Sequence, residues 1–274
     1  MEKFSVSICV YGGDNPAYFD IAMQSIFNQT LKPDEVVLVV DGPVGDDINS
    51  VIEKYQCEIL KVIRLEKNVG LGIARNISLE NCSHNLIALM DSDDISVPER
   101  FEKQIKCFEK DDSISLVGGQ ISEFIDTADN VVGVRKVPLG DSEIKEYMKK
   151  RCPINHVSVM LKKDDINKAG GYLDWYYNED YYLWIRMVLK GLNFANVPDV
   201  LVNVRVGNEM YQRRGGMKYF KSEAGIQKLM LDNKLISFPR YFINVSERLI
   251  LQVLMPNWLR GIVFKIFARE KTEK

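Results

Sequence analysis

The stretch Leu86-Ile-Ala-Leu-Met-Asp-Ser-Asp-Asp94 places three carboxylates directly after an uninterrupted apolar run. A short apolar run bounded by polar residues is typical of a strand inside a sheet that is covered on both faces. In open α/β sheets, ligands bind beyond the carboxyl ends of such strands. The sequence therefore predicts a binding site at Asp91 to Asp94.

The spacing of these acids indicates what they bind. Asp91 and Asp93 are two residues apart, so an extended backbone would direct both side chains to the same face. Two carboxylates this close repel each other unless a cation or hydrogen-bond donors neutralise them. Mg²⁺ and Mn²⁺ prefer such oxygen ligands and commonly bridge to substrate phosphates. The alternative is that Asp94 or Ser96 caps a helix beginning at Pro98, which would explain one acid but not three.

The chain up to Val117 alternates similar apolar strands with amphipathic helical patterns. Strands are predicted at Ser5–Val10, Glu35–Val40, Leu60–Leu65, Leu86–Met90 and Ile114–Val117, and helices near Ala17–Asn28, Asp46–Tyr55, Gly70–Asn81 and Pro98–Lys110. Because parallel strands need long crossover connections, this alternation predicts an α/β fold. We expect a Rossmann-like arrangement, with a mainly parallel central sheet between flanking helices.

Beyond Ile121 the patterns are mixed, and they become helical towards the C-terminus. A helix is predicted near Asp180–Lys190, with strands around Asn193–Val197 and Leu201–Val206, and consecutive helices are predicted after Gly215. Two of these helices have apolar residues at helical spacing, which is typical of amphipathic helices. The residues are Phe238, Tyr241, Phe242, Val245, Leu249 and Val253 in one, and Trp258, Leu259, Ile262, Val263, Ile266 and Phe267 in the other.

The formal net charge of the 274 residues is −2, but the charge is unevenly distributed. Residues 208–274 contain 13 basic and 6 acidic side chains, whereas the preceding 207 residues contain 23 basic and 32 acidic ones. A basic C-terminal region predicts an anionic partner, either nucleic acid or a membrane surface. Because its cations lie beside broad apolar faces, and no nucleic-acid-binding motif is present, we favour interfacial membrane binding. Packing of these helices on the rest of the protein remains the alternative.

Composition excludes several classes of protein. The five cysteines are scattered without a C-x-x-C pair and there are two histidines, which argues against a disulfide framework and against a zinc site. No apolar run reaches the roughly 18 residues that a membrane-spanning helix needs. The chain enters its first strand without a preceding secretory signal. A reducing, cytoplasmic setting is therefore expected.

Five segments together resemble a known family. Asp91-Ser-Asp-Asp94 after a hydrophobic strand resembles the D-x-D motif of inverting family 2 glycosyltransferases with the GT-A fold. The other segments follow in the family's order: Ser5-Val-Ser-Ile-Cys-Val-Tyr11, Ser25-Ile-Phe-Asn-Gln-Thr30 with Glu35-Val-Val-Leu-Val-Val-Asp-Gly42, Asn68-Val-Gly-Leu-Gly-Ile-Ala-Arg-Asn76, and Asn178-Glu-Asp-Tyr-Tyr-Leu-Trp-Ile-Arg186. The resemblance covers roughly residues 4–206.

The resemblance implies roles for residues that would bind a nucleotide sugar. Asp41 would contact the base, Tyr11 would line the nucleotide pocket, and Arg75 would help to hold the nucleotide. Asp91 would contact the ribose, and Asp93, with Asp91 beside it, would hold the Mn²⁺ or Mg²⁺ that bridges the phosphates. Read from the residues alone, the alternatives are a turn residue before Gly42-Pro43 for Asp41 and a solvated helix cation for Arg75.

The same resemblance makes Asp180 the catalytic base, with Glu179 beside it. Without the family match, two acids in the first turn of a helix would be explained by the helix dipole. Trp175 is the favoured acceptor contact, since aromatic rings stack on sugars. His156 is expected near the acceptor side, and a structural hydrogen-bonding role is the alternative to acceptor binding there. Other aromatic residues nearby belong to the acceptor platform or to the packing of the helix: Tyr176, Tyr177, Tyr181, Tyr182 and Trp184.

Arg213 and Arg214 precede two glycines and are candidates on chemical grounds alone. Their guanidinium groups could close over a diphosphate, because arginine pairs bidentately with phosphate oxygens. The alternative is a basic surface turn.

The resemblance is greatest to bacterial enzymes that build O-antigen, capsule or exopolysaccharide repeat units. It implies a UDP-hexose donor, with galactose or glucose favoured, and an undecaprenyl-diphosphate-linked saccharide acceptor at the inner face of the cell membrane. We expect a catalytic domain over 1–207, with a nucleotide-binding half at about 1–95 and an acceptor half at about 96–207, and a helical extension over 208–274. The competing interpretations are a nucleotidyltransferase and a non-catalytic carbohydrate-binding protein of the same fold.

Overall fold

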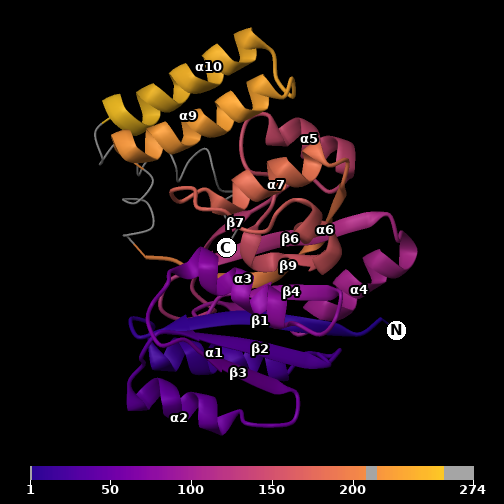
Figure 1. Ribbon diagram of the computed structural model, residues 1–274, viewed down its shortest axis with the longest axis vertical. Helices are drawn as coiled ribbons and strands as arrows, with labels where there is room; N and C mark the ends of the chain where they lie inside the picture. The colour runs from indigo at the N-terminus through magenta and orange to yellow at the C-terminus, as the bar shows by residue number, and fades with distance from the viewer. Residues whose placement is uncertain (1, 208–214, 256–274) are drawn as a thin grey trace.

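The computed structural model describes residues 2–207 and 215–255, and its first four strands form a parallel block. Strands β1 (Phe4–Tyr11), β2 (Glu35–Asp41), β3 (Leu60–Arg64) and β4 (Leu86–Met90) lie in the order β3-β2-β1-β4. Each coincides with a strand predicted from an apolar run, to within one residue at either end. The Rossmann-like sheet is therefore confirmed (Figure 1).

Helices follow each strand of this block, as the sequence predicts. Helices α1 (Pro16–Phe27), α2 (Asp46–Lys54) and α3 (Leu71–Asn81) follow β1, β2 and β3, and α4 (Arg100–Lys110) follows β4 and the two-residue strand β5 (Ile95–Ser96). The start of α1 is fixed by Asn15, whose side chain accepts hydrogen bonds from the N–H groups of Ala17 and Tyr18.

The second half of the sheet is mixed. Strand β8 (Met160–Lys162) is antiparallel to β4 and to β6 (Ile114–Phe124), while β9 (Asn193–Arg205) runs parallel to β6. The edge strands β5 and β7 (Val131–Arg135) are antiparallel to β9 and β6. The two strands predicted within 193–206 are one strand, β9, with irregular register beside β6.

Strand β6 is longer than the sequence predicts, because its two glycines continue it instead of ending it. A Cβ atom on Gly118 would lie 2.3 Å from the side-chain oxygen of Asn196, and one on Gly119 would lie 2.5 Å from Leu201. The glycines therefore allow β9 to pack closely against β6. With this packing, β6 continues to Phe124.

Two apolar cores lie on opposite faces of the sheet. Alternate residues of β2 and β4 belong to different cores, as the two-residue period of a strand requires. One core includes apolar residues of α1, α2 and α4, and the other includes residues of α3, α5 (Asp141–Met148), α6 (Lys163–Lys168), α7 (Glu179–Leu189) and α9 (Met217–Asp232). The sheet is thus covered on both faces.

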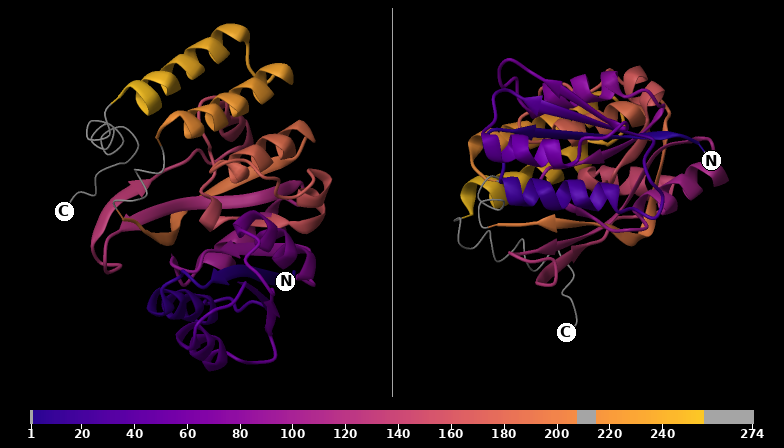
Figure 2. Two further views of the ribbon diagram at one scale, coloured as in Figure 1. Left: turned by 60° about the vertical axis from the view of Figure 1, so that its left-hand side comes forward. Right: turned by 90° about the horizontal axis from the view of Figure 1, so that it is seen from below.

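The C-terminal part of the described chain is a helical hairpin. Helices α9 and α10 (Phe238–Leu249) pack side by side, and a π-helical turn, η2 (Ile250–Leu254), extends α10. The hairpin lies at the end of the molecule opposite α1 and α2 (Figures 1 and 2). Consecutive helices after Gly215 are therefore confirmed, whereas the helix predicted after Pro256 lies outside the described residues.

Helix α10 buries two polar side chains and exposes several apolar ones. Asn244 donates to the Gln227 side chain at 2.7 Å, and Arg248 pairs with Glu223 at 2.5 Å. Arg248 also donates to the Lys150 carbonyl, which ties the hairpin to the end of α5. The outward surface carries apolar side chains that are at least half exposed: Phe238, Phe242, Ile243, Ile250 and Leu254. We call these five residues the outer face of α10.

Candidate active site

The predicted site residues of the first half meet at one edge of the sheet. In the registers of β1, Tyr11 pairs with Asp41 of β2 and Ile8 pairs with Met90 of β4. Asp91 follows Met90, so it continues beyond the same edge. The parallel order therefore brings together three residues that are distant in the sequence.

Arg75 lies at the centre of this edge. It projects from α3, is 7% exposed, and forms ion pairs with Asp91 at 2.9 Å and with Glu179 at 3.5 Å. Burial alone would lower the pKa of Arg75, but the charge of Asp91 and further groups including Glu179 raise it above its ordinary value. Burial likewise tends to raise the pKa of Asp91, and Arg75 outweighs this, so that the pKa of Asp91 is lowered. Arg75 is therefore a buried cation between two carboxylates and not a solvated helix cation.

Asp41 organises the loop in front of α3. Its two carboxylate oxygens accept hydrogen bonds from the N–H groups of Val69 at 2.7 Å and Gly70 at 3.1 Å. Gly42 follows in a left-handed conformation, with φ +87°, and a Cβ atom there would lie 2.6 Å from the Asn68 nitrogen. Asp41 thus fixes the loop before α3 and not the turn at Gly42-Pro43, and each of its oxygens keeps a further lone pair for a ligand. Contact with a base stays a prediction.

Asp93 presents a carboxylate at the surface of the site, next to two other acids. Partial burial, followed by the charges of Asp91 and Asp14, raises the pKa of Asp93 to about 6. Asp14 follows β1 and accepts hydrogen bonds from the Ser92 hydroxyl at 2.8 Å and the Tyr11 N–H at 3.1 Å. Burial, more than any other effect, raises its pKa as well. Asp14 is a site residue that the sequence reasoning missed.

The donor set at Asp93 suits a hard divalent cation that also binds phosphate. Asp93 forms no ion pair with the side chains that the structure describes, and the charge of Arg205 offsets only part of the repulsion from Asp91 and Asp14. No group of three or more acidic, histidine or cysteine side chains within 2–207 and 215–255 is arranged to enclose a metal. A cation here would take one or two protein carboxylates, with substrate phosphates and water completing its shell, as Mg²⁺ commonly does.

Asp94 and Arg205 join this loop to the second half of the sheet. The Arg205 N–H donates to the Asp94 carboxylate at 2.9 Å, and its Nε donates to the Asp93 carbonyl at 3.3 Å. The Arg205 guanidinium lies over the ring of Tyr18, 3.7 Å from its centroid. The third acid of the motif, whose role the sequence did not assign, therefore anchors β9. It does not cap α4, whose N-cap is Glu99.

Glu179 and Asp180 begin α7 and reach the same site from the other half of the chain. Glu179 pairs with Arg75, and burial together with the charge of Asp180 raises the pKa of Glu179. Asp180 is half-buried, and one of its oxygens lies 2.6 Å from the Tyr181 nitrogen. The ion pair with Arg75 thus places Glu179 at the carboxylate edge, and Asp180 is its neighbour in the chain. Their catalytic roles stay predictions.

His156 contacts Tyr172, whose ring in turn lies against Arg75. Its Nε2 lies 2.7 Å from the Tyr172 hydroxyl, and the Arg75 guanidinium lies 5.8 Å from the centroid of the Tyr172 ring. Burial and the charge of Arg75 lower the pKa of His156 to about 3, so the ring is neutral at physiological pH. Asn76 holds Tyr172 by accepting from its N–H at 2.9 Å and donating to its carbonyl at 2.8 Å. His156 therefore has the hydrogen-bonding role that competed with acceptor binding.

Trp175 packs against the C-terminal hairpin. Its indole N–H donates to the Ser222 carbonyl in α9 at 3.1 Å, and its ring stacks on Tyr182 with centroids 4.3 Å apart. Contact between Trp175 and an acceptor stays a prediction. Arg213 and Arg214 lie outside the described residues, so the lid proposed for them also stays a prediction.

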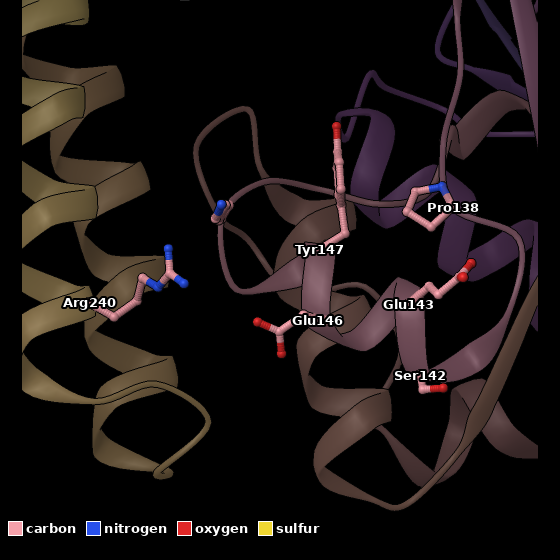
Figure 3. A pocket seen from close by; sticks show the side chains of 7 residues that line it. Pro138, Ser142, Glu143, Glu146, Tyr147 and Arg240 are labelled. Atoms are coloured by element: carbon pink, nitrogen blue, oxygen red, sulfur yellow. The ribbon is translucent and has the colours of Figure 1, made fainter.

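A surface pocket of about 480 Å³ lies away from this edge, between α5 and α10. Figure 3 shows Glu146 of α5 and Arg240 of α10 pointing towards each other across it. Its wall also includes Pro138, Ser142, Glu143, Tyr147 and Lys150. No predicted site residue lines it, so it belongs to the junction between the hairpin and the rest of the protein.

Comparison with known proteins identifies the family. The model of "Glycosyl transferase family 2" matches residues 5–168, which include β1, the Asp91–Asp94 segment and Arg75. The chain belongs to glycosyl transferase family 2. It is a glycosyltransferase, as the motif resemblance implies.

Two curated relatives match nearly the whole chain. The amylovoran biosynthesis glycosyltransferase AmsE of Erwinia amylovora is 40% identical over 88% of this chain and 91% of its own. The UDP-Gal:alpha-D-GlcNAc-diphosphoundecaprenol beta-1,3-galactosyltransferase of Escherichia coli is 38% identical over 97% of both chains.

Solved structures share the fold at low sequence identity. Residues 1–349 of S. aureus TarS in complex with UDP-GlcNAc superimpose with a TM-score of 0.67 at 17% identity, over 98% of this chain and 82% of that fragment. The Pyrobaculum calidifontis mannosyltransferase in complex with GDP-Man and Mn²⁺ gives 0.63 at 14% identity, over 95% and 72%. With the family match, these similarities confirm the predicted GT-A fold.

Proposed function

We propose that this glycosyltransferase moves galactose or glucose, with inversion, from a UDP-sugar to a saccharide carried on undecaprenyl diphosphate, in the synthesis of a bacterial surface polysaccharide. The observation that carries the proposal is Arg75, whose ion pairs join Asp91 of the D-x-D segment to Glu179 of the E-D segment. A transferase must hold donor and acceptor at one site. The name of the E. coli relative, matched over 97% of both chains, supports these substrate classes.

On the donor side, the chain offers contacts for each part of a nucleotide sugar. Asp41 would accept from a base N–H with its remaining lone pairs, and Tyr11, whose side chain is about half exposed, would line the nucleotide pocket. Asp91 would accept a hydrogen bond from a ribose hydroxyl, while Arg75 keeps the Asp91 carboxylate ionised. Asp93, with Asp91 beside it, would hold a divalent metal, Mn²⁺ or Mg²⁺. When bound, the metal would offset the negative charge of the diphosphate leaving group.

On the acceptor side, the reaction needs one displacement step. The acceptor hydroxyl oxygen forms a bond to the anomeric carbon of the sugar as the bond from that carbon to the diphosphate oxygen breaks, and UDP leaves with the electron pair. The hydroxyl proton passes to the Asp180 carboxylate, which acts as general base. The ion pair with Arg75 would keep the carboxylate of Glu179, the neighbour of Asp180, engaged on the donor side.

A donor and acceptor screen tests the proposal. The protein would be incubated with a panel of UDP- and other nucleotide sugars and a synthetic GlcNAc- or GalNAc-diphosphate-lipid, with and without Mn²⁺, and products identified by mass spectrometry. We expect one added hexose and an equal amount of UDP, with metal required. In a parallel incubation with nucleoside triphosphates and sugar phosphates, release of inorganic diphosphate would favour a nucleotidyltransferase instead. Sugar binding without turnover would favour a non-catalytic carbohydrate-binding protein.

The same proposal places the protein on the cytoplasmic face of the cell membrane, through its C-terminal helices. Among the helices that the structure describes, none combines the length and apolar character required to cross a bilayer. The outer face of α10 supports surface binding, because its five apolar side chains are at least half exposed while Asn244 and Arg248 are buried on the helix. Such an arrangement suits a helix that lies in the lipid headgroup region.

Vesicle co-sedimentation with anionic lipid tests this location. The variant Phe238→Gln/Phe242→Gln removes two large apolar groups from the outer face of α10 and should lower the bound fraction. Val132→Gln, at an exposed position on β7, is the matched control and should bind as the wild type does. Equal partitioning of all three proteins would remove this part of the proposal.

A further inference from the structure

A tight turn immediately before α7 holds two exposed tyrosines. The Asn178 N–H donates to the Trp175 carbonyl at 3.1 Å, which closes a turn over Tyr176 and Tyr177. Tyr177 has a φ of 54°, a left-handed conformation that is sterically unfavourable for a bulky side chain. Such conformations persist where surrounding contacts impose them, and they are common at binding sites.

Contacts with α9 impose this conformation. The Ser222 hydroxyl donates to the Tyr176 carbonyl at 2.7 Å and accepts from the Asn178 side chain at 3.0 Å, while the Trp175 indole donates to the Ser222 carbonyl. Gly225, one turn further along α9, leaves room for the Trp175 ring, since a Cβ atom there would lie 2.8 Å from it. The turn is therefore fixed on α9 by both of its ends.

The fixed turn presents an aromatic surface beside a cation. Tyr176 and Tyr177 are 37% and 52% exposed, and their ring centroids are 4.5 Å apart. The ammonium group of Lys218, in the first turn of α9, lies 4.0 Å from the centroid of the Tyr176 ring. Glu179 and Asp180 follow the turn directly. An exposed aromatic and cationic surface thus adjoins the proposed catalytic base.

We propose that Tyr176, Tyr177 and Lys218 form the acceptor subsite, in which the tyrosine rings bind the sugar and Lys218 binds the diphosphate that links it to the lipid. The inference rests on the proposed function, whose acceptor contains both chemical groups. Sugar C–H surfaces stack on aromatic rings, and an ammonium group attracts phosphate oxygens. Trp175 serves as the anchor of the turn, since its indole N–H is already bonded to α9.

Kinetics with two acceptors separate the two halves of this subsite. One acceptor carries the saccharide on an alkyl diphosphate, and the other carries the same saccharide on a neutral alkyl chain. The full-length variants are Tyr177→Gly and Lys218→Gln. Matched controls are Leu173→Ala, an exposed apolar residue before the turn, and Lys228→Gln, an exposed cation further along α9 that pairs with Asp232. Saturation-transfer NMR measures binding of each acceptor directly.

We expect Tyr177→Gly to raise KM for both acceptors by about tenfold, the loss of roughly one stacking contact. Its thermal stability should not fall, because glycine adopts a positive φ without strain. Lys218→Gln should raise KM for the diphosphate acceptor alone. UDP-sugar affinity and donor hydrolysis should match the wild type in both variants, and neither control should change KM.

The outcomes distinguish this inference from the function on which it rests. Unchanged KM and unchanged NMR contacts in both tyrosine and lysine variants would overturn the subsite while leaving the transferase intact. If the wild type transfers to neither acceptor, the proposed acceptor class fails. In that case, a saccharide site at the turn is still supported if the wild type shows NMR contacts with the acceptor that Tyr177→Gly loses. If the wild type shows no such contacts, the subsite is overturned.

Discussion

The two sides of the active site are built in different ways. On the donor side, Asp41 and Asp91 extend from β2 and β4, the parallel strands on either side of β1, so sheet register alone brings them to one edge. On the acceptor side, the turn at 175–178 is held by α9, and the Trp175–Ser222 hydrogen bond spans 47 residues of sequence. The donor side therefore depends on local strand order, and the acceptor side depends on the C-terminal hairpin.

The two sides meet at Arg75. Its guanidinium pairs with Asp91 from the donor side and Glu179 from the acceptor side, and it lies over Tyr172. A buried cation between two carboxylates holds them close where they would otherwise repel each other. Changes on one side should therefore affect one substrate, whereas changes at Arg75 should affect both.

The largest effect is expected from Asp180→Asn. Loss of the general base should reduce transfer by at least about a hundredfold, while UDP-sugar binding, measured by calorimetry, stays close to wild type. The matched control is Asp174→Asn, an exposed acid in the loop before α7. Near-normal turnover in Asp180→Asn would show that the acceptor side does not supply the base.

Arg75→Ala should weaken both sides together. Removing one partner from a buried ion pair leaves uncompensated charges, so we expect a loss of about 3 kcal/mol in unfolding free energy and higher KM for both substrates. Chemical denaturation and steady-state kinetics measure these effects. Arg64→Ala, at an exposed position on β3, is the control. A change in donor KM alone would contradict the idea that Arg75 joins the two sides.

The same contrast explains what the sequence could predict. Parallel strands with acids at their carboxyl ends have a strong pattern, so Asp41, Asp91 and their meeting place follow from the sequence. Asp14 and Tyr172 have no such pattern. Asp14 lies in the site because its carboxylate accepts a hydrogen bond from the Ser92 hydroxyl. Tyr172 lies there because the Asn76 side chain forms hydrogen bonds with its backbone. Contacts of that kind depend on the tertiary structure.

The orientation of α10 could likewise not be predicted from the sequence pattern. Its spacing predicts an apolar and a polar face, but periodicity does not specify which face is buried. In the structure, Asn244 and Arg248 are buried because Gln227, Glu223 and backbone carbonyls satisfy their hydrogen-bonding groups. A buried polar face is stable only with such partners, and these come from a different helix.

A smaller effect is expected from the pH dependence that His156 confers. Its pKa in the folded protein is about 3, mainly because of burial, whereas an unfolded histidine has a pKa of about 6.5. Below pH 6.5 the unfolded chain therefore binds a proton that the folded chain does not, and stability falls with the pH. Between pH 6.5 and pH 5 this amounts to about 2 kcal/mol.

Thermal unfolding of His156→Gln checks this value. The stability difference between wild type and variant should shrink as the pH falls from 7.5 to 5, because the wild type alone pays the protonation cost at residue 156. His84→Gln, which changes the other histidine near the start of β4, is measured alongside as the matched substitution. A difference for His156→Gln that does not vary with pH would mean that this ring titrates normally in the fold.

The smallest effect is expected at Ser222, and it tests how far the acceptor side depends on the hairpin. Ser222→Ala removes the hydroxyl that joins the Tyr176 carbonyl to the Asn178 side chain, at a cost of about 1 kcal/mol. Because the turn then loses its fixed position, transfer should slow by about fivefold. Donor hydrolysis should be unchanged, and Ser222→Thr, which keeps a hydroxyl, should restore part of the rate.

Ser50→Ala makes the same change in α2, where the hydroxyl bonds only within its helix, and should leave transfer unaffected. Equal losses in transfer and donor hydrolysis would instead show that α9 supports the whole site and not the acceptor side alone.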